Sequence, residues 1–387
     1  MKIPFHRPNL PKSLDDIYRD SIRSGWLTTG SQAQEFESKL AQYLDAEYVV
    51  AVNSCTAALH LALTAKGFSK GDKYIAPTYT FASTVECGEY LGMEPILVDC
   101  KKDSFLIDLN QVEDLLKKES GVKAVLPVHY AGKPVDMRHL FELAEKFGVF
   151  IVEDAAHALE TESRAGKVGN TVYAAAFSFY ANKNMTTAGE GGALATNDSK
   201  LAEKVKKLSL HGITKDGWDR FKTHGSWEYD INELGFKYNL SDLAASFGLW
   251  QMGQLEDWKK RRFDIVNKYI QGLGSIDGLI LPELKNGHSW HLFVIQLKTE
   301  HWSISRNEFI EKMNQNGIGL AVHYKPIHAL SYYRENYDLD PNQFPRANSL
   351  WNSVVTLPLY PSLTDADVEY IINSIEELSK RYSKLFP

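Results

Sequence analysis

Lys183 lies in the stretch SFYANKNMTTAGEGG (178–192), after a strand-like run and just before a glycine pair. Glycines let a ligand approach the backbone, and burial lowers the pKa of a lysine so that the free amine is available. A free amine at the end of a strand is suited to forming a Schiff base with a carbonyl compound. The alternative is an ordinary lysine in a solvent-exposed turn. This stretch alone leaves both interpretations open.

A second candidate site is VNSCTAAL (52–59), where an apolar run changes into a helical pattern. Free backbone N–H groups at the start of a helix bind anions, so Ser54, Cys55 and Thr56 can hold a phosphate there. A simple N-cap, in which Ser54 or Thr56 satisfies the helix, explains the same residues.

Two carboxylates end a hydrophobic strand pattern in VEDAAHA (152–158). Parallel α/β sheets bind ligands at the carboxyl ends of their strands. Neighbouring strand residues point to opposite faces, so Glu153 and Asp154 cannot both enter one pocket, and one of them is expected to be solvated or to cap a helix. A buried carboxylate needs a cationic partner, and a protonated pyridine nitrogen would be one. His157 either contacts a flat ring or is a structural histidine.

Together the three sites describe a site for pyridoxal 5′-phosphate. They provide a phosphate cradle at a helix start, an acid for the ring nitrogen and a lysine for the aldehyde. The order along the chain, from the cradle through Asp154 to Lys183, is the usual one in enzymes resembling aspartate aminotransferase.

The elements that must position these residues alternate between strand and helix patterns over the first two thirds of the chain. Buried strands are expected at 48–52, 73–77, 95–100, 123–130, 147–156, 174–180 and 192–196, and helices at 56–67 and 136–148. This alternation predicts βαβ units and an α/β fold with a mostly parallel sheet between two layers of helices.

The pattern changes after about residue 250. A long helical stretch is followed by a strand at 292–297 and by helices at 305–317 and 365–381. We therefore expect a large cofactor-binding domain over 1–250 and a smaller α+β domain over 251–387.

Bulk properties exclude several classes of protein. The net charge of −6 argues against a nucleic-acid-binding protein. Three scattered cysteines do not form a disulfide framework, and the histidines lack the spacing of metal ligands, so no metal is expected. No apolar run is long enough to span a membrane, and the N-terminus lacks the apolar core of a secretory signal. A cytoplasmic enzyme without a membrane partner is expected.

Nearly the whole chain resembles the DegT/StrS family of pyridoxal phosphate-dependent nucleotide-sugar aminotransferases. The resemblance is carried by nine blocks in order: SGWLTTGSQAQEFE (24–37), NSCTAALHLAL (53–63), APTYTFASTVE (76–86), PVHYAGKPVDM (127–137), EDAAHALET (153–161), SFYANKNMTTAGEGGALATND (178–198), GFKYNLSDLAAS (235–246), VHYKPIH (322–328) and LPLYPSLTDADVEYI (357–371). It implies an aspartate-aminotransferase-like fold with a sheet of the seven-stranded type, and a homodimer with shared active sites.

The resemblance also implies roles for individual residues. Lys183 would form the Schiff base and move protons between the cofactor and the substrate carbon, while Asp154 would pair with the pyridinium nitrogen. Phe81 would stack on one face of the ring, with His157 near the other face or the phenolic oxygen. The phosphate would be held by hydroxyl and backbone groups of Ser54, Cys55, Thr56 and Ser178.

A neighbouring subunit completes the phosphate site in this family, and that contribution would come from GFKYNLSD (235–242). This chain has Lys237-Tyr238-Asn239 where the commonest pattern is Asn-Tyr-Arg. Lys237 would therefore offer a point charge, and Asn239 would replace a positive charge. The variant is similar to the branch that makes UDP-4-amino-4-deoxy-L-arabinose, which favours amination at C4 over C3.

Substrate-binding residues are also implied. They are Thr29 in the first block and His323, Tyr324 and Lys325 in VHYKPIH, a segment that otherwise reads as a surface turn. The aromatic and charged stretch 218–229 is either an ordinary loop or a segment that reaches the nucleotide of a neighbouring site.

The implied activity is the transfer of an amino group from L-glutamate to a nucleotide-linked keto-deoxy-sugar, releasing 2-oxoglutarate and giving an amino sugar for lipopolysaccharide, other surface polysaccharide or glycan synthesis. One branch of the family removes a sugar hydroxyl instead and has histidine in place of the lysine, so Lys183 favours transamination. The alternatives are such a sugar dehydratase, or a non-catalytic regulator that has kept the fold.

Overall fold

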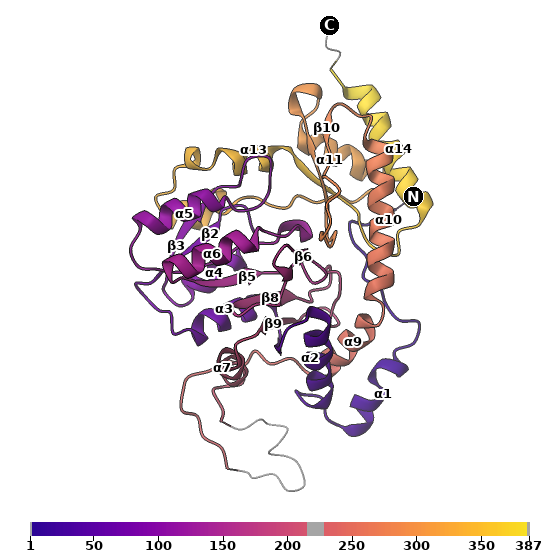
Figure 1. The fold of residues 1–387 in the computed structure, drawn as a ribbon. Coiled ribbons are helices and arrows are strands. Elements are labelled where there is room, and N and C mark those ends of the chain that lie inside the picture. The colour runs from indigo at the N-terminus through magenta and orange to yellow at the C-terminus, as the bar shows by residue number, and fades with distance from the viewer. Residues whose placement is uncertain (1, 215–227, 385–387) are drawn as a thin grey trace.

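The computed structural model describes residues 2–214 and 228–384 (Figure 1). The predicted loop 218–229 lies, up to residue 227, outside the described residues. In the part of the chain that the structure describes, no helix is long and apolar enough to cross a bilayer.

A seven-stranded sheet forms the centre of the larger part of the molecule. Across the sheet the strands are β1 (Tyr48–Val52), β9 (Gly192–Thr196), β8 (Ala174–Ser178), β5 (Phe150–Asp154), β4 (Val122–Val125), β2 (Lys73–Pro77) and β3 (Glu94–Val98). Strand β9 is antiparallel to both of its neighbours, and the other four pairs are parallel. The prediction of a mostly parallel sheet of seven strands is confirmed.

Helices cover both faces of this sheet (Figure 1). They are α2 (Ser31–Leu44), α3 (Cys55–Ala65), α4 (Ser83–Glu89), α5 (Leu109–Lys118), α6 (Met137–Phe147), α7 (Ser199–Ser209) and α9 (Asp242–Met252), and α1 (Asp15–Ser24) packs against α9. A two-stranded ribbon, β6 (Glu162–Ser163) with β7 (Gly166–Lys167), follows β5. The alternation seen in the sequence therefore corresponds to the layers of the fold.

Strand β8 shows how the sequence determines the two layers. Ala174 and Ala176 lie in the hydrophobic cluster that contains α3, whereas Ala175 and Phe177 lie in the cluster that contains Phe36 of α2. Successive side chains of a strand point to opposite faces, so one strand packs against both helix layers. Helix α3 is apolar on every side, and such a helix is buried.

The C-terminal part is built on a smaller sheet of three antiparallel strands, β10 (Leu279–Ile280), β11 (Phe293–Leu297) and β12 (Val354–Leu357). Its helices are α10 (Leu255–Leu273), α11 (Arg306–Gln315), α12 (Ser331–Asn336), α13 (Pro345–Ser353) and α14 (Asp365–Tyr382). Figure 1 shows α10 and α14 side by side. Ile3 joins the hydrophobic cluster of this part, so the N-terminus crosses back to it. A domain boundary near residue 250 stays a prediction.

Candidate active site

Lys183 lies in the loop between β8 and β9. Its backbone N–H donates to the Tyr180 carbonyl at 2.9 Å, and the Thr186 hydroxyl donates to the Phe179 carbonyl at 2.9 Å. These bonds turn the chain back toward β9. Burial lowers the pKa of the Lys183 amine to about 8, although the charge of Asp154 opposes this shift. At neutral pH a larger fraction of this amine is therefore in the free form than for an ordinary lysine, which favours Schiff-base chemistry.

Asp154 ends β5 and is buried, with 4% of its surface exposed. Its Oδ2 accepts a hydrogen bond from the Thr84 hydroxyl at 2.6 Å, and its Oδ1 accepts one from the Ala156 N–H at 3.1 Å. A carboxylate only accepts, so Thr84 is the donor here and accepts in turn from Thr80, 2.7 Å away. Asp154 is thus held by hydroxyl and amide donors.

Glu153 is neither solvated nor a helix cap, so that expectation for the second carboxylate was wrong. Its side chain is 2% exposed, and its Oε2 lies 2.9 Å from Nε2 of buried His129. The Val135 N–H donates to Nδ1 of His129, so the proton of this ring is on Nε2 and points at Glu153. Glu153 and Asp154 thus bond to different parts of the chain, as the alternation of a strand requires.

Thr84→Val is expected to weaken cofactor binding. The change keeps the shape of the side chain but removes the donor to Asp154, a bond of about 1 kcal/mol, so the dissociation constant should rise roughly fivefold. Titration of the cofactor-free protein, followed by absorbance, measures this. Thr84→Ser keeps the hydroxyl and should bind as the wild type does. An equal loss in both variants would refute the role given to this hydrogen bond.

The start of α3 lies against the edge of the sheet where β5 and β8 end. Ser54 caps the helix, since its hydroxyl accepts the Ala57 N–H at 3.1 Å. The Cys55 thiol donates to the Ala176 carbonyl of β8 at 3.3 Å, so the side chain of Cys55 is turned into the sheet. Its contribution to an anion site is therefore the backbone N–H, which has no partner inside a helix at this position. The N-cap and the phosphate cradle are compatible at this helix start.

Gly192 brings this helix start close to Ser178. A Cβ atom at Gly192 would lie 2.4 Å from the carbonyl carbon of Ser54, so only glycine allows the approach. In the sheet Gly192 is the register partner of Ser178. The hydroxyl of Ser178, which accepts weakly from the Tyr180 N–H at 3.4 Å, thus lies near the cradle. Thr56 is partly buried in the first turn of the same helix.

His157 has a defined tautomer. The Ala131 N–H donates to its Nδ1 at 3.2 Å, so Nε2 carries the proton and donates to the Tyr324 hydroxyl at 3.0 Å. The Tyr324 proton is then free to bond elsewhere. Burial raises the pKa of the Tyr324 phenol, and the charge of Asp154 raises it further, so the phenol stays protonated and lies near that carboxylate. His157 and Tyr324 together present a hydrogen-bond donor close to Asp154.

Phe81 follows β2 and leaves 60% of its surface exposed. Its ring centroid lies 5.9 Å from that of Tyr324. An exposed aromatic ring beside buried polar groups is a suitable stacking surface for a flat ligand.

Lys237 bonds to Asn239, which in turn bonds to the predicted substrate residue Thr29. The Lys237 amine donates to Asn239 Oδ1 at 2.6 Å, and Asn239 Nδ2 donates to the Thr29 hydroxyl at 2.7 Å. Thr29 in turn donates to the Leu240 carbonyl at 2.6 Å. The backbone of this segment pairs with Asn53, next to the start of α3. The Thr29 hydroxyl therefore holds residues 237–240 in place through its hydrogen bonds to Asn239 and Leu240.

His323 lies close to the lysine and Lys325 points elsewhere. His323 Nδ1 is 2.9 Å from the Thr356 hydroxyl, and burial together with the charge of Lys183 lowers the pKa of His323 to about 4. The amine of exposed Lys325 lies over the Trp351 ring, 5.7 Å from its centroid. The structure thus brings His323 and Tyr324 toward Lys183 and Asp154, whereas Lys325 lies on the surface.

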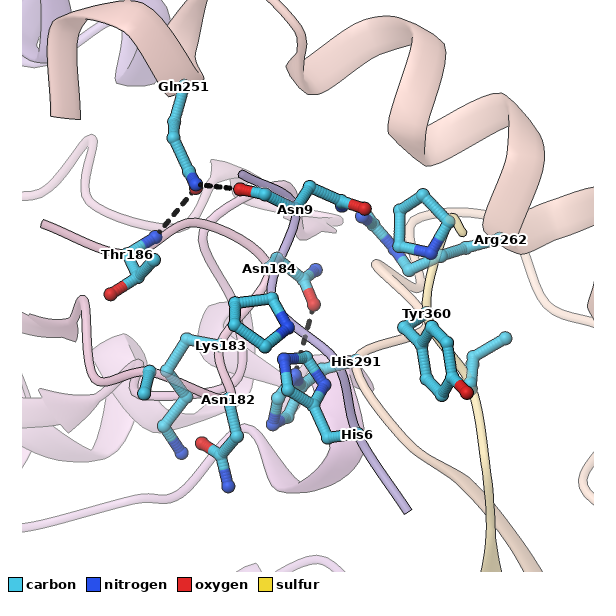
Figure 2. Close-up of a pocket in the computed structure, with 14 residues that line it drawn as sticks. His6, Asn9, Asn182, Lys183, Asn184, Thr186, Gln251, Arg262, His291 and Tyr360 are labelled. Atoms are coloured by element: carbon cyan, nitrogen blue, oxygen red, sulfur yellow. Dashed lines mark hydrogen bonds between the residues drawn. The ribbon is translucent and has the colours of Figure 1, made fainter. Parts of the chain in front are cut away.

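A small cavity borders the Lys183 loop on the side of the N-terminus (Figure 2). Its walls include His6 and Asn9, the loop residues Asn182 and Asn184, and residues from the C-terminal part: Arg262, His291 and Tyr360. The N-terminal segment is held here because Gln251 donates to the Asn9 carbonyl and accepts from the Thr186 N–H. The sequence analysis gave none of these wall residues a role, and His6, Asn9, Arg262 and His291 lie outside the motifs that it identified.

Acid is expected to destabilise the protein through the histidines near Lys183. Burial lowers the pKa of His6 and His323 to about 4, and that of His157 and His291 well below 6.5. Between pH 6.5 and 4 the unfolded chain binds more protons, so the free energy of unfolding falls as the pH falls through this window. Urea midpoints at several pH values between 7.5 and 4.5 measure the slope. His6→Gln should make it shallower, and an unchanged midpoint in the wild type would contradict the expectation.

The comparisons with known proteins agree with this geometry. Residues 10–376 match the model of the DegT/DnrJ/EryC1/StrS aminotransferase family, so the chain belongs to that family. It is 38% identical over 381 residues to the spore coat polysaccharide biosynthesis protein SpsC of Bacillus subtilis, covering 98% of this chain and 97% of that protein.

Solved structures extend the likeness to three dimensions. Spr1654 of Streptococcus pneumoniae, described as a sugar aminotransferase and solved in its PMP form, superposes with a TM-score of 0.91 at 32% identity, over 98% of this chain and 100% of that one. PseC of Helicobacter pylori, an aminotransferase involved in the biosynthesis of pseudoaminic acid, gives 0.90 at 27% identity over 98% and 100%. The aspartate-aminotransferase-like fold is confirmed, and the protein is a pyridoxal phosphate-dependent aminotransferase.

The site residues fit this cofactor. Asp154 is buried, with hydroxyl and amide donors but no cationic side chain bonded to it in the described chain, which suits a protonated ring nitrogen. Exposed Phe81 offers a surface for the ring, and the start of α3 offers donors for the phosphate. When bound, the cofactor supplies the electron sink for reactions at an amino-bearing carbon.

Proposed function

We propose that this protein transfers an amino group from L-glutamate to the keto group of a nucleotide-linked deoxy-sugar, at C4 rather than C3. The observation that supports this most is the gathering of the Lys183 amine, the Asp154 carboxylate and the start of α3 at one edge of the sheet. SpsC and PseC, named for polysaccharide and pseudoaminic acid biosynthesis, support a sugar acceptor and a role in making surface polysaccharide, lipopolysaccharide or glycan.

In this proposal Lys183 would hold the cofactor through its Nζ, and the same amine would accept the α-proton of glutamate. Asp154 would hold the ring nitrogen protonated, and Thr84 orients Asp154. Phe81 stacks on the ring, while the Tyr324 hydroxyl, oriented by His157, donates a hydrogen bond within the site. Backbone N–H groups of Cys55 and Thr56, with the hydroxyls of Ser54 and Ser178, bind the phosphate.

The second half of the proposal concerns the assembly. We infer a cytoplasmic homodimer in which Lys237 and Asn239 of one subunit reach the phosphate site of the other. Within one chain the Tyr238 carbonyl, between these two residues, bonds to Asn53, and the exposed side chain of Lys237 is accessible to a neighbouring subunit. His323 and, from the surface, Lys325 would contact the sugar nucleotide, and Thr29 would contribute through the segment that it holds.

Absorbance of the purified protein tests the amino donor first. L-Glutamate should shift a band near ~420 nm to near ~330 nm, and 2-oxoglutarate should reverse the shift. The aminated form is then offered a panel of UDP-, dTDP- and GDP-linked 3-keto and 4-keto sugars. Mass spectrometry detects the added nitrogen, and NMR of the product assigns it to C3 or C4.

The outcomes separate the alternatives. A band that does not respond to glutamate would refute the donor, and loss of a sugar hydroxyl without 2-oxoglutarate release would identify a dehydratase. A protein without any cofactor band would support a non-catalytic homologue. Amination at C3 alone would refute the position of transfer and leave the rest of the proposal in place.

A further inference from the structure

A buried ion pair connects α10, the first helix of the C-terminal part, to Asn184, the residue after Lys183. Glu160 and Arg262 have side chains that are 0% and 2% exposed, and an Nη2 proton of Arg262 is donated to Oε2 of Glu160. The same oxygen accepts a hydrogen bond from Nδ2 of Asn184 at 2.6 Å. One carboxylate oxygen therefore binds the lysine loop and α10 at the same time.

The ion pair determines the orientation of Asn184. A carboxylate has no proton to donate, so the NH₂ group of Asn184 must face Glu160 and its Oδ1 must face away. Oδ1 lies 3.0 Å from Nδ1 of His291, so this ring nitrogen carries a proton and donates it. Figure 2 shows this bond beside Lys183 and Arg262. The ring of His291 lies 4.4 Å, centroid to centroid, from that of His157.

The network thus reaches two predicted functional residues from one buried pair. Asn184 directly follows Lys183 in the sequence. His291 packs against His157, and His157 orients the hydroxyl of Tyr324. Asn182, on the other side of Lys183, has no hydrogen-bond partner for its Oδ1 in the described chain. In the described chain, Asn184 is thus the neighbour of Lys183 whose side chain is bonded to the buried pair.

A buried ion pair by itself is weak evidence for a stabilising role, because removing two charges from water costs about as much as their attraction returns. This pair also orients Asn184 in the loop that carries Lys183, which is a role separate from stability. We propose that Glu160 and Arg262 are positioning residues, which hold the side chain of Lys183 in its partly buried position through Asn184 and hold His157 through His291.

The test measures the Lys183 amine itself, in the full-length chain freed of cofactor. Competitive labelling with a trace of acetic anhydride, read by mass spectrometry at pH 6 to 11, gives the pKa of this amine. Asn184→Ala removes the hydrogen bonds from the lysine loop to Glu160 and His291, so the Lys183 amine should become more exposed to water. Its pKa should then rise from about 8 toward 10.5, by roughly half a unit or more. Asn182→Ala, the matched control, should keep the wild-type profile.

The double variant Glu160→Met/Arg262→Met tests the pair without leaving a buried charge. Apolar replacement of a buried ion pair is tolerated, so Tm should stay within about 5 °C of the wild type. The pKa of Lys183 should nevertheless rise as it does in Asn184→Ala. A purely structural pair predicts a change in Tm with an unchanged labelling profile.

The proposal is overturned if Asn184→Ala keeps the wild-type profile, or if a folded double variant keeps it. If the double variant does not fold, Asn184→Ala and Asn182→Ala decide the question alone. The proposal builds on the role of Lys183 in the proposed function, but the labelling needs neither sugar nor glutamate. An error in the sugar or the donor would therefore leave this result unaffected.

Discussion

Lys183→Ala is expected to abolish the glutamate-dependent shift of the cofactor band and to lower the rate of transamination by about 10²- to 10⁴-fold, the usual contribution of a proton-transferring group. Without the Nζ atom no side chain at this position can bind the cofactor's aldehyde carbon or accept the α-proton of glutamate. Burial lowers the pKa of the Lys183 amine because placing its charged form away from water costs folding free energy. The alanine variant does not have this cost, so its Tm should equal or exceed that of the wild type. Stopped-flow absorbance after mixing with L-glutamate measures the rate.

Lys39→Ala is the control for Lys183→Ala. Lys39 lies on α2, is 52% exposed and forms a surface ion pair with Glu35 at 2.8 Å. Surface pairs of this kind contribute little, so the rate and Tm should match the wild type. A Lys183→Ala variant that still completes the half reaction at a rate near that of the wild type would overturn the assignment of the catalytic amine.

Asp154→Asn should lower kcat/KM by about 10²- to 10³-fold, the magnitude seen when one preorganised electrostatic group is removed. The amide has nearly the same size and can still accept the Thr84 proton, so the fold should be kept. It cannot carry the negative charge that keeps the ring nitrogen protonated, and the electron sink is weakened. Steady-state kinetics with L-glutamate, together with a thermal unfolding curve, separate the loss of activity from a loss of stability.

Glu153→Gln is the matched control, since it changes the neighbouring buried carboxylate. Glu153 pairs with His129 rather than facing the site. Gln can still accept the Nε2 proton of neutral His129, but without a charge on the acceptor the hydrogen bond is weaker, so Tm should fall while kcat/KM changes by no more than about threefold. If Glu153→Gln lost as much activity as Asp154→Asn, the assignment of opposite faces to the two carboxylates would have to be abandoned.

Much of the fold could be predicted from the sequence, because burial follows local periodicity. The strands at 48–52, 73–77 and 192–196 have the bounds that their apolar runs indicated. Each run is flanked by polar or small residues that end it, and the period of the side chains differs between strand and helix. The C-terminal part was recognisable for the same reason, since α10, α11 and α14 carry long helical patterns.

The candidate site was predictable where its chemistry depends on residue type at an element's end. Lys183, Asp154 and the start of α3 each follow or precede a buried element, so their place at one sheet edge follows from the topology. The hydrogen-bond partners of these site residues could not be predicted from the sequence. Thr84 lies 70 residues before Asp154, and His129 lies 24 before Glu153, and no local pattern joins them.

The sequence by itself therefore determined the order of the elements, the cofactor class and the lysine at its centre. Three hydrogen bonds could be seen only in the tertiary structure. Glu153 bonds to His129, Thr29 accepts a hydrogen bond from Asn239, and Asn184 donates one to the buried pair of Glu160 and Arg262. The physical reason is that elements are selected by local burial and backbone geometry. A hydrogen bond between distant segments depends instead on how the finished layers pack together.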